Sequence, residues 1–297
     1  VDAFIGTNEI GRILEAADEG VNFRALPLLS IGRKTATYLY DFDTPRHRAT
    51  ASHTAFIKIA EGCDRPCAFC SIPQMRGSFR SRRFGSILKE AEDLARAGVK
   101  EIVLIAQDSS RFGEDLGERE ALAKLIRALG EIEGLEWIRV MYAYPTHISD
   151  EFLKAIAETP KAVKYLDMPL QHASRSVLKL MKRGGNRESL EKLIRRVREK
   201  IPGITIRTTF ITGFPGETEE DFEELMTFVR NCEFDNVGVF TYSDEEGTPA
   251  FDLPDKVDAR TAKRRRAALM KEQAKISKKK NKEKIGRVFR VLFEGYS

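Results

Sequence analysis

The amino-acid sequence predicts an α/β fold, a partial (β/α)6 barrel of the TIM type. Six apolar runs have the length of strands, and each is followed by a stretch with helical periodicity. Alternation at this spacing indicates a parallel sheet with helices packed against it. Because the strands read as buried, we expect an incomplete barrel closed on itself, with a doubly wound open sheet as the alternative.

The strands and helices are expected to follow one another along residues 53–258. Helices are expected at 86–98, 118–132, 149–159, 174–183 with 186–200, and 218–232, and in the basic segment after Asp258. Trp137, Met168 and Met181 have core spacing and are interpreted as packing residues. The expected strands are residues 54–60, 101–107, 137–143, 165–170, 204–213 and 236–242.

Both ends of the chain depart from this pattern. Residues 1–20 read as a short strand, an Asn8 cap and an amphipathic helix, and are expected to be the tail of a preceding α/β domain. Residues 21–52 are expected to be a linker. After a basic helix at 259–285, residues 286–297 switch to β-type residues and are expected to begin a further β domain.

The composition favours a soluble, cytoplasmic protein without a membrane anchor. No apolar run approaches the roughly 18 residues that a membrane span needs, and no signal-peptide pattern occurs at Val1. Residues 259–284 carry twelve Lys or Arg and two Glu within a whole-chain net charge of +5, so the remaining body is mildly acidic. The basic segment is interpreted either as a solvated helix face or as a contact to ribosome or RNA.

Three of the four cysteines, Cys63, Cys67 and Cys70, lie within eight residues directly after the first expected strand. In barrels of this kind the loops at the carboxyl ends of the strands carry the reactive groups, so three thiolates are expected at the barrel mouth. Three thiolates can hold a 4Fe-4S cluster and leave one iron open to a further ligand. The spacing therefore favours a cluster with a vacant coordination position.

A zinc site is the alternative for these cysteines. Structural zinc takes four protein ligands, and His53 or His172 would have to supply the fourth. Phe69, between the second and third cysteines, is expected to shield a cluster. Cys232 has no thiol partner in the sequence and is interpreted as a small buried apolar residue.

Several segments together resemble the methylthiotransferase family of the radical S-adenosylmethionine superfamily, from about Phe56 to Phe222. The resemblance implies that the open iron binds S-adenosylmethionine, and that an electron from the cluster cleaves it to methionine and a 5′-deoxyadenosyl radical. It also implies a second 4Fe-4S cluster on a preceding domain and a small β domain, called TRAM, after the barrel. The segments are EGCDRPCAFC, IPQMRGSFRSRR, IAQDSSRFGEDLG, YLDMPLQHAS, LKLMKRGG and FITGFPGETEEDF.

Two motifs distinguish the branches of this family. AQDSSRFG and LQHAS resemble the RimO branch, which acts on an aspartate of a small-subunit ribosomal protein. The resemblance thus implies methylthio transfer to the β-carbon of an aspartate, with that ribosomal protein and an electron donor as partners. The alternatives are methylthiolation of adenosine 37 in transfer RNA and, from another class, a zinc-stabilised ribosome- or RNA-binding module.

The resemblance also implies cofactor-binding residues at two strand ends. Gln107 and Asp108 follow the second strand, where the superfamily places groups that accept hydrogen bonds from the methionine ammonium. Gln171 and His172 follow the fourth strand, within reach of the ribose or the methionine carboxylate. Alternatively, Asp108 only caps a turn and His172 is a hydrogen-bonded buried histidine.

The fifth strand and its loop supply the remaining expected cofactor contacts. Gly213, Gly216 and Glu217 resemble the segment that supports the adenine in the superfamily, because glycine lets the main chain approach a nucleotide. A strand-to-helix turn capped by Thr218 is a compatible interpretation. Thr209 shares its face with Ile211, and either Thr209 or Arg207 is expected to face the barrel interior.

Four arginines follow the cysteines closely. Arg76, Arg80, Arg82 and Arg83 are candidates for holding the carboxylate of an aspartate substrate, because guanidinium groups bind carboxylates in bidentate fashion. Solvation at the surface is the competing interpretation. Arg76 and Arg80 are taken as the tentative substrate contacts.

Overall fold

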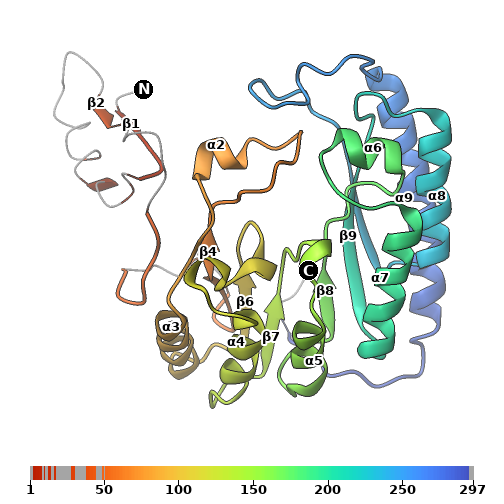
Figure 1. The fold of residues 1–297 in the computed structure, drawn as a ribbon. Helices are drawn as coiled ribbons and strands as arrows, with labels where there is room; N and C mark the ends of the chain where they lie inside the picture. The colour runs from red at the N-terminus through yellow and green to blue at the C-terminus, as the bar shows by residue number, and fades with distance from the viewer. Residues whose placement is uncertain are drawn as a thin grey trace.

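The computed structural model describes residues 3–8, 10, 13–14, 17, 28–30, 38–44, 49 and 51–293. Six strands run parallel in chain order, with helices on their outer side (Figure 1). The strands are β3 (Thr54–Lys58), β6 (Glu101–Ile105), β7 (Trp137–Val140), β8 (Tyr165–Asp167), β9 (Thr205–Thr212) and β10 (Asn236–Thr241). The predicted β/α alternation is confirmed.

The strands form two parallel three-stranded sheets, β3-β6-β7 and β8-β9-β10. A bridge between Ile138 and Ala162 and a hydrogen bond from Ala143 N to Asp167 O (2.9 Å) connect β7 to the segment around β8. Within the described part of the chain, the outer strands β3 and β10 are not paired with each other. The expected closure of the barrel is therefore wrong. The six strands form a curved, open arrangement in which the first strand and the last strand do not meet.

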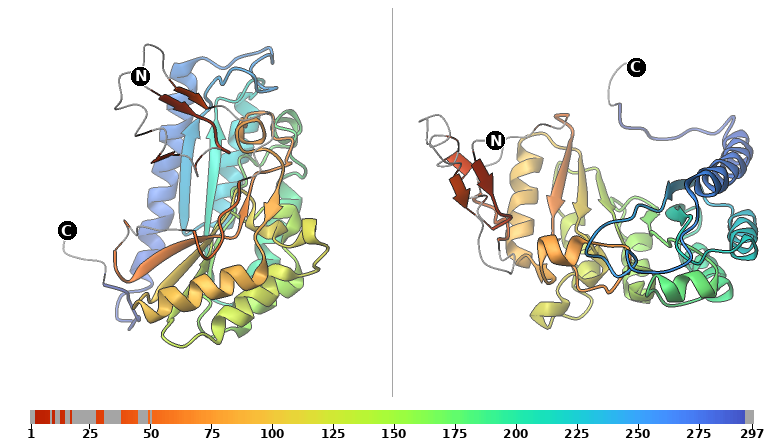
Figure 2. Two further views of the ribbon diagram at one scale, coloured as in Figure 1. Left: turned by 90° about the vertical axis from the view of Figure 1, so that its left-hand side faces the viewer. Right: turned by 90° about the horizontal axis from the view of Figure 1, so that it is seen from above.

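The helices cover the convex side of the curved sheets, as the view from above in Figure 2 shows. Alternation along β9 buries every second side chain, and Phe210 of the buried set packs against Phe228 on the helix that follows β9. The half-exposed set therefore faces the barrel interior, and it contains both Arg207 and Thr209, where only one of the two was expected. The helices are α3 (Phe84–Arg96), α4 (Ala121–Gly130), α5 (Asp150–Glu158), α6 (Arg175–Leu180), α7 (Arg187–Lys200), α8 (Glu219–Cys232) and α9 (Ala259–Lys282).

Polar side chains define where the outer helices begin. Thr218 accepts a hydrogen bond from Asp221 N at the start of α8, so the predicted cap is confirmed. Asp258 likewise caps the long basic helix α9, which packs on β9 and β10. Of the helices in the described ranges, none is both long and apolar enough to cross a bilayer.

Short elements surround the ends of the strands. A two-residue antiparallel pair joins β4 (Ala60–Glu61) to β5 (Arg80–Ser81), and α2 (Ile72–Arg76) lies between them in the chain. The loop after β6 contains the 3-10 turns η2 (Ser109–Arg111) and η3 (Glu114–Leu116). The loop after β7 contains η4 (Pro145–His147). These turns were not predicted, because single turns have no periodicity.

The ends of the chain are described only partly. Strand β1 (Ala3–Ile5) pairs in parallel with β2 (Leu28–Ser30), which falls inside the range predicted as a linker. Most of the helix expected near residues 9–20 lies outside the described residues. Residues 286–293 contain no strand, and residues 294–297 lie outside the described residues. The division of the chain into a domain tail, a linker, a barrel and a TRAM-like start remains a prediction.

Candidate active site

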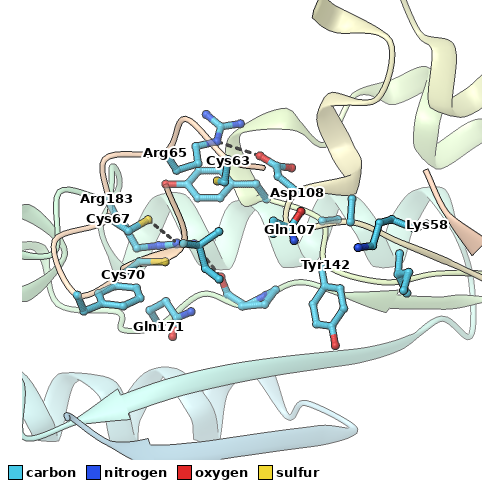
Figure 3. Close-up of a pocket in the computed structure, with 17 residues that line it drawn as sticks. Lys58, Cys63, Arg65, Cys67, Cys70, Gln107, Asp108, Tyr142, Gln171 and Arg183 are labelled. Carbon is cyan, nitrogen blue, oxygen red and sulfur yellow. Dashed lines mark hydrogen bonds and ion pairs between the residues drawn. The ribbon is translucent and has the colours of Figure 1, made fainter. Parts of the chain in front are cut away.

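A cavity of about 410 Å³ opens at the carboxyl ends of the strands, where sequence reasoning placed the reactive groups. Its walls come from the loops after β3, β6, β7 and β8, so segments far apart in the chain meet there (Figure 3). All three clustered cysteines line it. The cavity combines thiols, amides, aromatic rings and cationic side chains in one space.

Backbone hydrogen bonds hold the cysteine loop in place. Gly62, at φ +83°, starts the loop, and an added Cβ would lie 2.1 Å from Ser78 O, so only glycine fits there. Cys63 N donates to Gly77 O (3.1 Å). Further along, Ala68 N donates to Met181 O (3.0 Å), and Ala68 O accepts from the loop that follows β10. The thiols therefore sit on a braced loop.

The three thiols line one cavity, and two of them are shifted away from the pKa of an ordinary thiol. Burial is the main cause that raises the pKa values of Cys63 and Cys70, and the neighbouring thiols add to it. In the described ranges, no group of three or more His, Cys, Asp or Glu side chains is arranged to hold a metal ion. A 4Fe-4S cluster takes each thiolate on a different iron, and three cysteines that line one cavity could supply these ligands.

The two histidines proposed for zinc are not available to the cysteines. His53 precedes β3, at the end of that strand opposite the cysteine loop. His172 is fully buried, accepts a hydrogen bond from Ser174 N at Nδ1 (3.0 Å) and lies with Nε2 3.3 Å from Glu217 Oε1. The structure thus places His172 as the hydrogen-bonded buried histidine and not as a cavity contact.

Gln107 and Asp108 both line the cavity, as predicted from their position after β6. Gln107 Nε2 donates to Glu61 Oε1 (2.8 Å), which leaves Gln107 Oε1 buried without a hydrogen-bond partner. Asp108 is 1% exposed and accepts from Arg65 Nε at Oδ2 (2.9 Å). Its other oxygen accepts from the Ser110 side chain, but Asp108 makes no side-chain hydrogen bond to the backbone of the 3-10 turn that follows, so the alternative that it only caps this turn is wrong.

Gln171 lines the cavity from the end of β8. Its backbone adopts φ +73°, a left-handed conformation that is rare outside glycine. Two backbone hydrogen bonds to β9 hold this conformation: Gln171 N donates to Thr209 O, and Gln171 O accepts from Ile211 N, each at 2.8 Å. Its Oε1 is a second buried acceptor without a hydrogen-bond partner. Gln107 and Gln171 thus both line the cavity, and each has a buried amide oxygen without a hydrogen-bond partner in the described residues.

An aromatic and cationic stack, not predicted from the sequence, lies beside the cysteines. Arg65 and Arg183 both lie over the Tyr144 ring, at 4.1 and 4.3 Å from its centroid. Arg183 also donates to Cys67 Sγ (3.4 Å) and to Pro169 O (2.8 Å). Arg65 Nη2 lies 2.8 Å from His147 Nδ1. No local pattern marks this stack, because its members come from three separate loops.

The residues expected around the adenine lie outside the cavity wall. Gly213 and Gly216 adopt φ of +76° and +81°, but added Cβ atoms would meet Ala262 on α9 and Leu180 on α6. The backbone at both glycines therefore packs closely against neighbouring helices of the protein and not against a ligand site. Glu217 is buried and binds Arg265 on α9 (3.0 Å) and Gly213 N, and Thr209 faces the interior without lining the cavity.

The four arginines after the cysteines do not form a substrate clamp in this structure. Arg82 is 2% exposed and bound to Glu90 (2.6 Å), Ser86 and a backbone oxygen, so it is structural. Arg80 donates to backbone oxygens of its own loop, and Arg83 is exposed at the start of α3. Neither Arg76 nor Arg80 lines the cavity.

Two further predictions concern apolar positions. Phe69 lines the cavity, and its ring packs edge to face on that of Phe214, with 6.5 Å between the ring centroids. This position is consistent with shielding of the thiols. Cys232 is 3% exposed on α8, and burial raises its pKa to about 12. The interpretation of Cys232 as a buried apolar residue is confirmed.

Comparison with protein families supports the predicted resemblance. Residues 57–229 match the profile of the Radical SAM superfamily. The chain is 55% identical to the ribosomal protein uS12 methylthiotransferase RimO of Koribacter versatilis over 88% of this chain, and 50% identical to that of Solibacter usitatus over 100%. It spans 52% and 63% of these two relatives. The resemblance to the RimO branch is confirmed.

Solved structures support the fold at low sequence identity. Coproporphyrinogen III oxidase (HemN) from Escherichia coli superposes with a TM-score of 0.57 and 17% identity, over 75% of this chain and 54% of that one. The radical S-adenosylmethionine methyltransferase TsrM from Kitasatospora setae gives 0.55 and 19%, over 66% and 38%. At sequence identities this low, the superpositions show a shared α/β fold and nothing about function.

Proposed function

Because this chain belongs to the radical SAM superfamily, we propose that it methylthiolates the β-carbon of an aspartate side chain in ribosomal protein uS12. The observation that carries the proposal is one cavity lined by all three thiols and by Gln107 and Gln171, each of which has a buried amide oxygen without a partner. The likeness to RimO proteins supports the choice of substrate. Nothing in the site geometry favours transfer RNA over this substrate.

Cys63, Cys67 and Cys70 would hold a 4Fe-4S cluster. When bound, the cluster would supply the electron for reductive cleavage of S-adenosylmethionine, the chemistry that prepares hydrogen abstraction from the target carbon. The protein's part is to exclude water and to orient the reacting groups. Phe69 would help to exclude water from the thiols. The backbone hydrogen bonds of the cysteine loop restrict where the thiols can lie.

Three cavity residues are suited to the methionine moiety of S-adenosylmethionine. Its ammonium would donate to the free oxygens of Gln107 and Gln171, which lack donors in the described structure. Its carboxylate would pair with Arg183, the guanidinium nearest the thiols. Tyr144 holds that guanidinium by cation–π contact.

The remaining partners are proposed from the resemblance. Methylthio transfer needs a second 4Fe-4S cluster, and Cys232 is not a candidate ligand for it because it is buried on α8. An electron donor is also needed. The exposed cations of α9 are proposed to contact the ribosome or RNA, and a cytoplasmic location follows from such a substrate.

The central test is anaerobic reconstitution with iron and sulfide. We expect about four irons per chain, broad visible absorbance, and 5′-deoxyadenosine after reduction with S-adenosylmethionine. A variant with Cys63, Cys67 and Cys70 changed to Ala is the control and should give none of the three. One equivalent of zinc without redox activity would reject the enzyme and support a binding module.

The substrate is tested separately. Mass spectrometry of uS12 and of transfer RNA from a strain that lacks the gene should show loss of the methylthio group from uS12 alone. Loss from adenosine 37 of transfer RNA instead would replace the proposed substrate while leaving the radical chemistry intact.

A further inference from the structure

We propose that the cavity has a separate subsite for the side-chain carboxylate of the substrate, formed by Lys58 and Tyr142. This subsite, called the Lys58 end, lies on the far side of Gln107 from Cys67 and Cys70 (Figure 3). The proposal rests on the proposed function, because it assigns the position of the substrate aspartate. Nothing in the sequence pattern singled out either residue.

Lys58 is the last residue of β3 and points into the cavity from the barrel interior. Its Nζ lies 2.6 Å from Glu61 Oε2, and its side chain is 25% exposed. The ammonium also lies over the Tyr40 ring, 5.1 Å from its centroid. Because an ammonium carries three donors and Glu61 accepts one hydrogen bond, Lys58 retains donors for a ligand. The other Glu61 oxygen accepts from Gln107, so one buried carboxylate fixes both side chains.

Tyr142 follows β7 in a strained conformation that displays its side chain. Its φ is +61°, which costs energy for any residue other than glycine and is found mostly where the surroundings enforce it. Buried Asp167 accepts from Tyr142 N (3.1 Å), and Ser109 N donates to Tyr142 O (3.0 Å). Tyr142 is 42% exposed, and among the described residues no hydrogen bond to its hydroxyl is formed.

Asp167 is itself held by Arg207 on β9, at 2.7 Å. Thus both members of the Lys58 end rest on buried carboxylates, Glu61 at 5% and Asp167 at 0% exposure. Side chains that only face solvent do not need such support. Glu61 thus holds the Lys58 ammonium, and Asp167 holds the Tyr142 backbone in the conformation from which its side chain lines the cavity.

The other cations of the cavity have different commitments. Arg65 is bound to Asp108 and His147 and stacked on Tyr144, and Arg183 is bound to Cys67 and Pro169. Both lie beside the cysteine loop. Lys58 is the cavity-lining cation at the opposite end, where a substrate carbon must lie if the thiols occupy the cluster end.

The test measures binding of purified uS12 to the anaerobically reconstituted chain with S-adenosylmethionine present. Two forms of uS12 are compared, native and with the modified aspartate changed to Asn. We expect the native chain to bind the aspartate form about tenfold more tightly, the factor expected for one charge-assisted hydrogen bond. K58M should bind both forms equally, at the weaker level.

Two further variants keep the result interpretable. K58M leaves the buried Glu61 carboxylate without its cation, which is costly and could prevent folding. K58M/E61Q removes both charges and therefore tests the loss of Lys58 without that cost. Y142F keeps the ring and should lose part of the preference. Lys89, exposed on α3 and paired with Asp93, supplies the control K89M, which should behave as the native chain.

The outcomes separate the two proposals. If the native chain makes no 5′-deoxyadenosine, the proposed function fails. If it makes 5′-deoxyadenosine but binds both forms of uS12 equally, or if K58M and K58M/E61Q keep the tenfold preference, the Lys58 end is refuted while the proposed function stands.

Discussion

Arg265 should be the residue of the basic helix on which stability depends most. It lies on α9 with its side chain 5% exposed, and it donates to Glu217 Oε2, Glu217 O and Glu219 Oε2, each at 3.0 Å. Glu217 is fully buried, between Arg265, Gly213 N and His172. R265M would leave that carboxylate buried without its cation. Removing one partner of a buried pair costs about 3–5 kcal/mol.

That loss is a large part of the roughly 5–15 kcal/mol by which domains are stable, and it corresponds to a drop in Tm of roughly 6–15 °C. The assay is urea and thermal unfolding of the native chain, R265M, E217Q and the double variant. Arg264, the exposed neighbour that pairs with Glu219 at the surface, supplies the control R264M, which should unfold as the native chain does. If R265M is as stable as R264M, or the effects of R265M and E217Q simply add, the buried pair is not the anchor of α9.

Three other perturbations have expected outcomes. G62A should abolish iron binding on reconstitution because its Cβ would collide with a backbone oxygen of the facing loop, whereas G85A, where nothing lies within 4 Å, should bind iron normally; equal iron contents would contradict this. Cys232, whose pKa burial raises to about 12, should be alkylated at pH 8 about a thousandfold more slowly than an ordinary thiol until the chain is unfolded; labelling of native Cys232 at an ordinary rate would refute its burial. Burial, and then the charge of Arg65, lower the pKa of His147 below its usual value, so its contribution to stability is present above about pH 6.5 and lost as the pH falls through that range. Comparing the unfolding of the native chain and H147N at pH 7.5 and 5.5 checks this, and a gap that widens at low pH would refute it.

The cysteine site could be predicted from the sequence because its chemistry is local. Cys63, Cys67 and Cys70 follow one strand within eight residues, and a strand end in a parallel sheet faces the functional edge whatever the remaining fold does. Gln107 and Gln171 could be placed in the cavity for the same reason. Each directly follows a strand or its continuation.

His172 shows where that reasoning stops. It is the immediate neighbour of Gln171, but successive residues point in different directions, and His172 turns into a buried network with Glu217. The glycines at 213 and 216 were expected to approach a nucleotide, and they instead approach α9 and α6. A glycine in the sequence indicates that the backbone is closely approached at that position, but it does not show whether the neighbour is a ligand or another part of the protein.

By itself, the sequence determined the β/α alternation, the thiol set and the resemblance to the RimO branch, because these depend on periodicity, spacing and residue type. Only the tertiary structure decided that the six strands leave the barrel open. It also decided that Arg82 is structural, and that Arg65 and Arg183 share the Tyr144 ring. These outcomes depend on which loops meet in space. The physical reason is that long-range packing, rather than local pattern, sets the partner of a charged side chain.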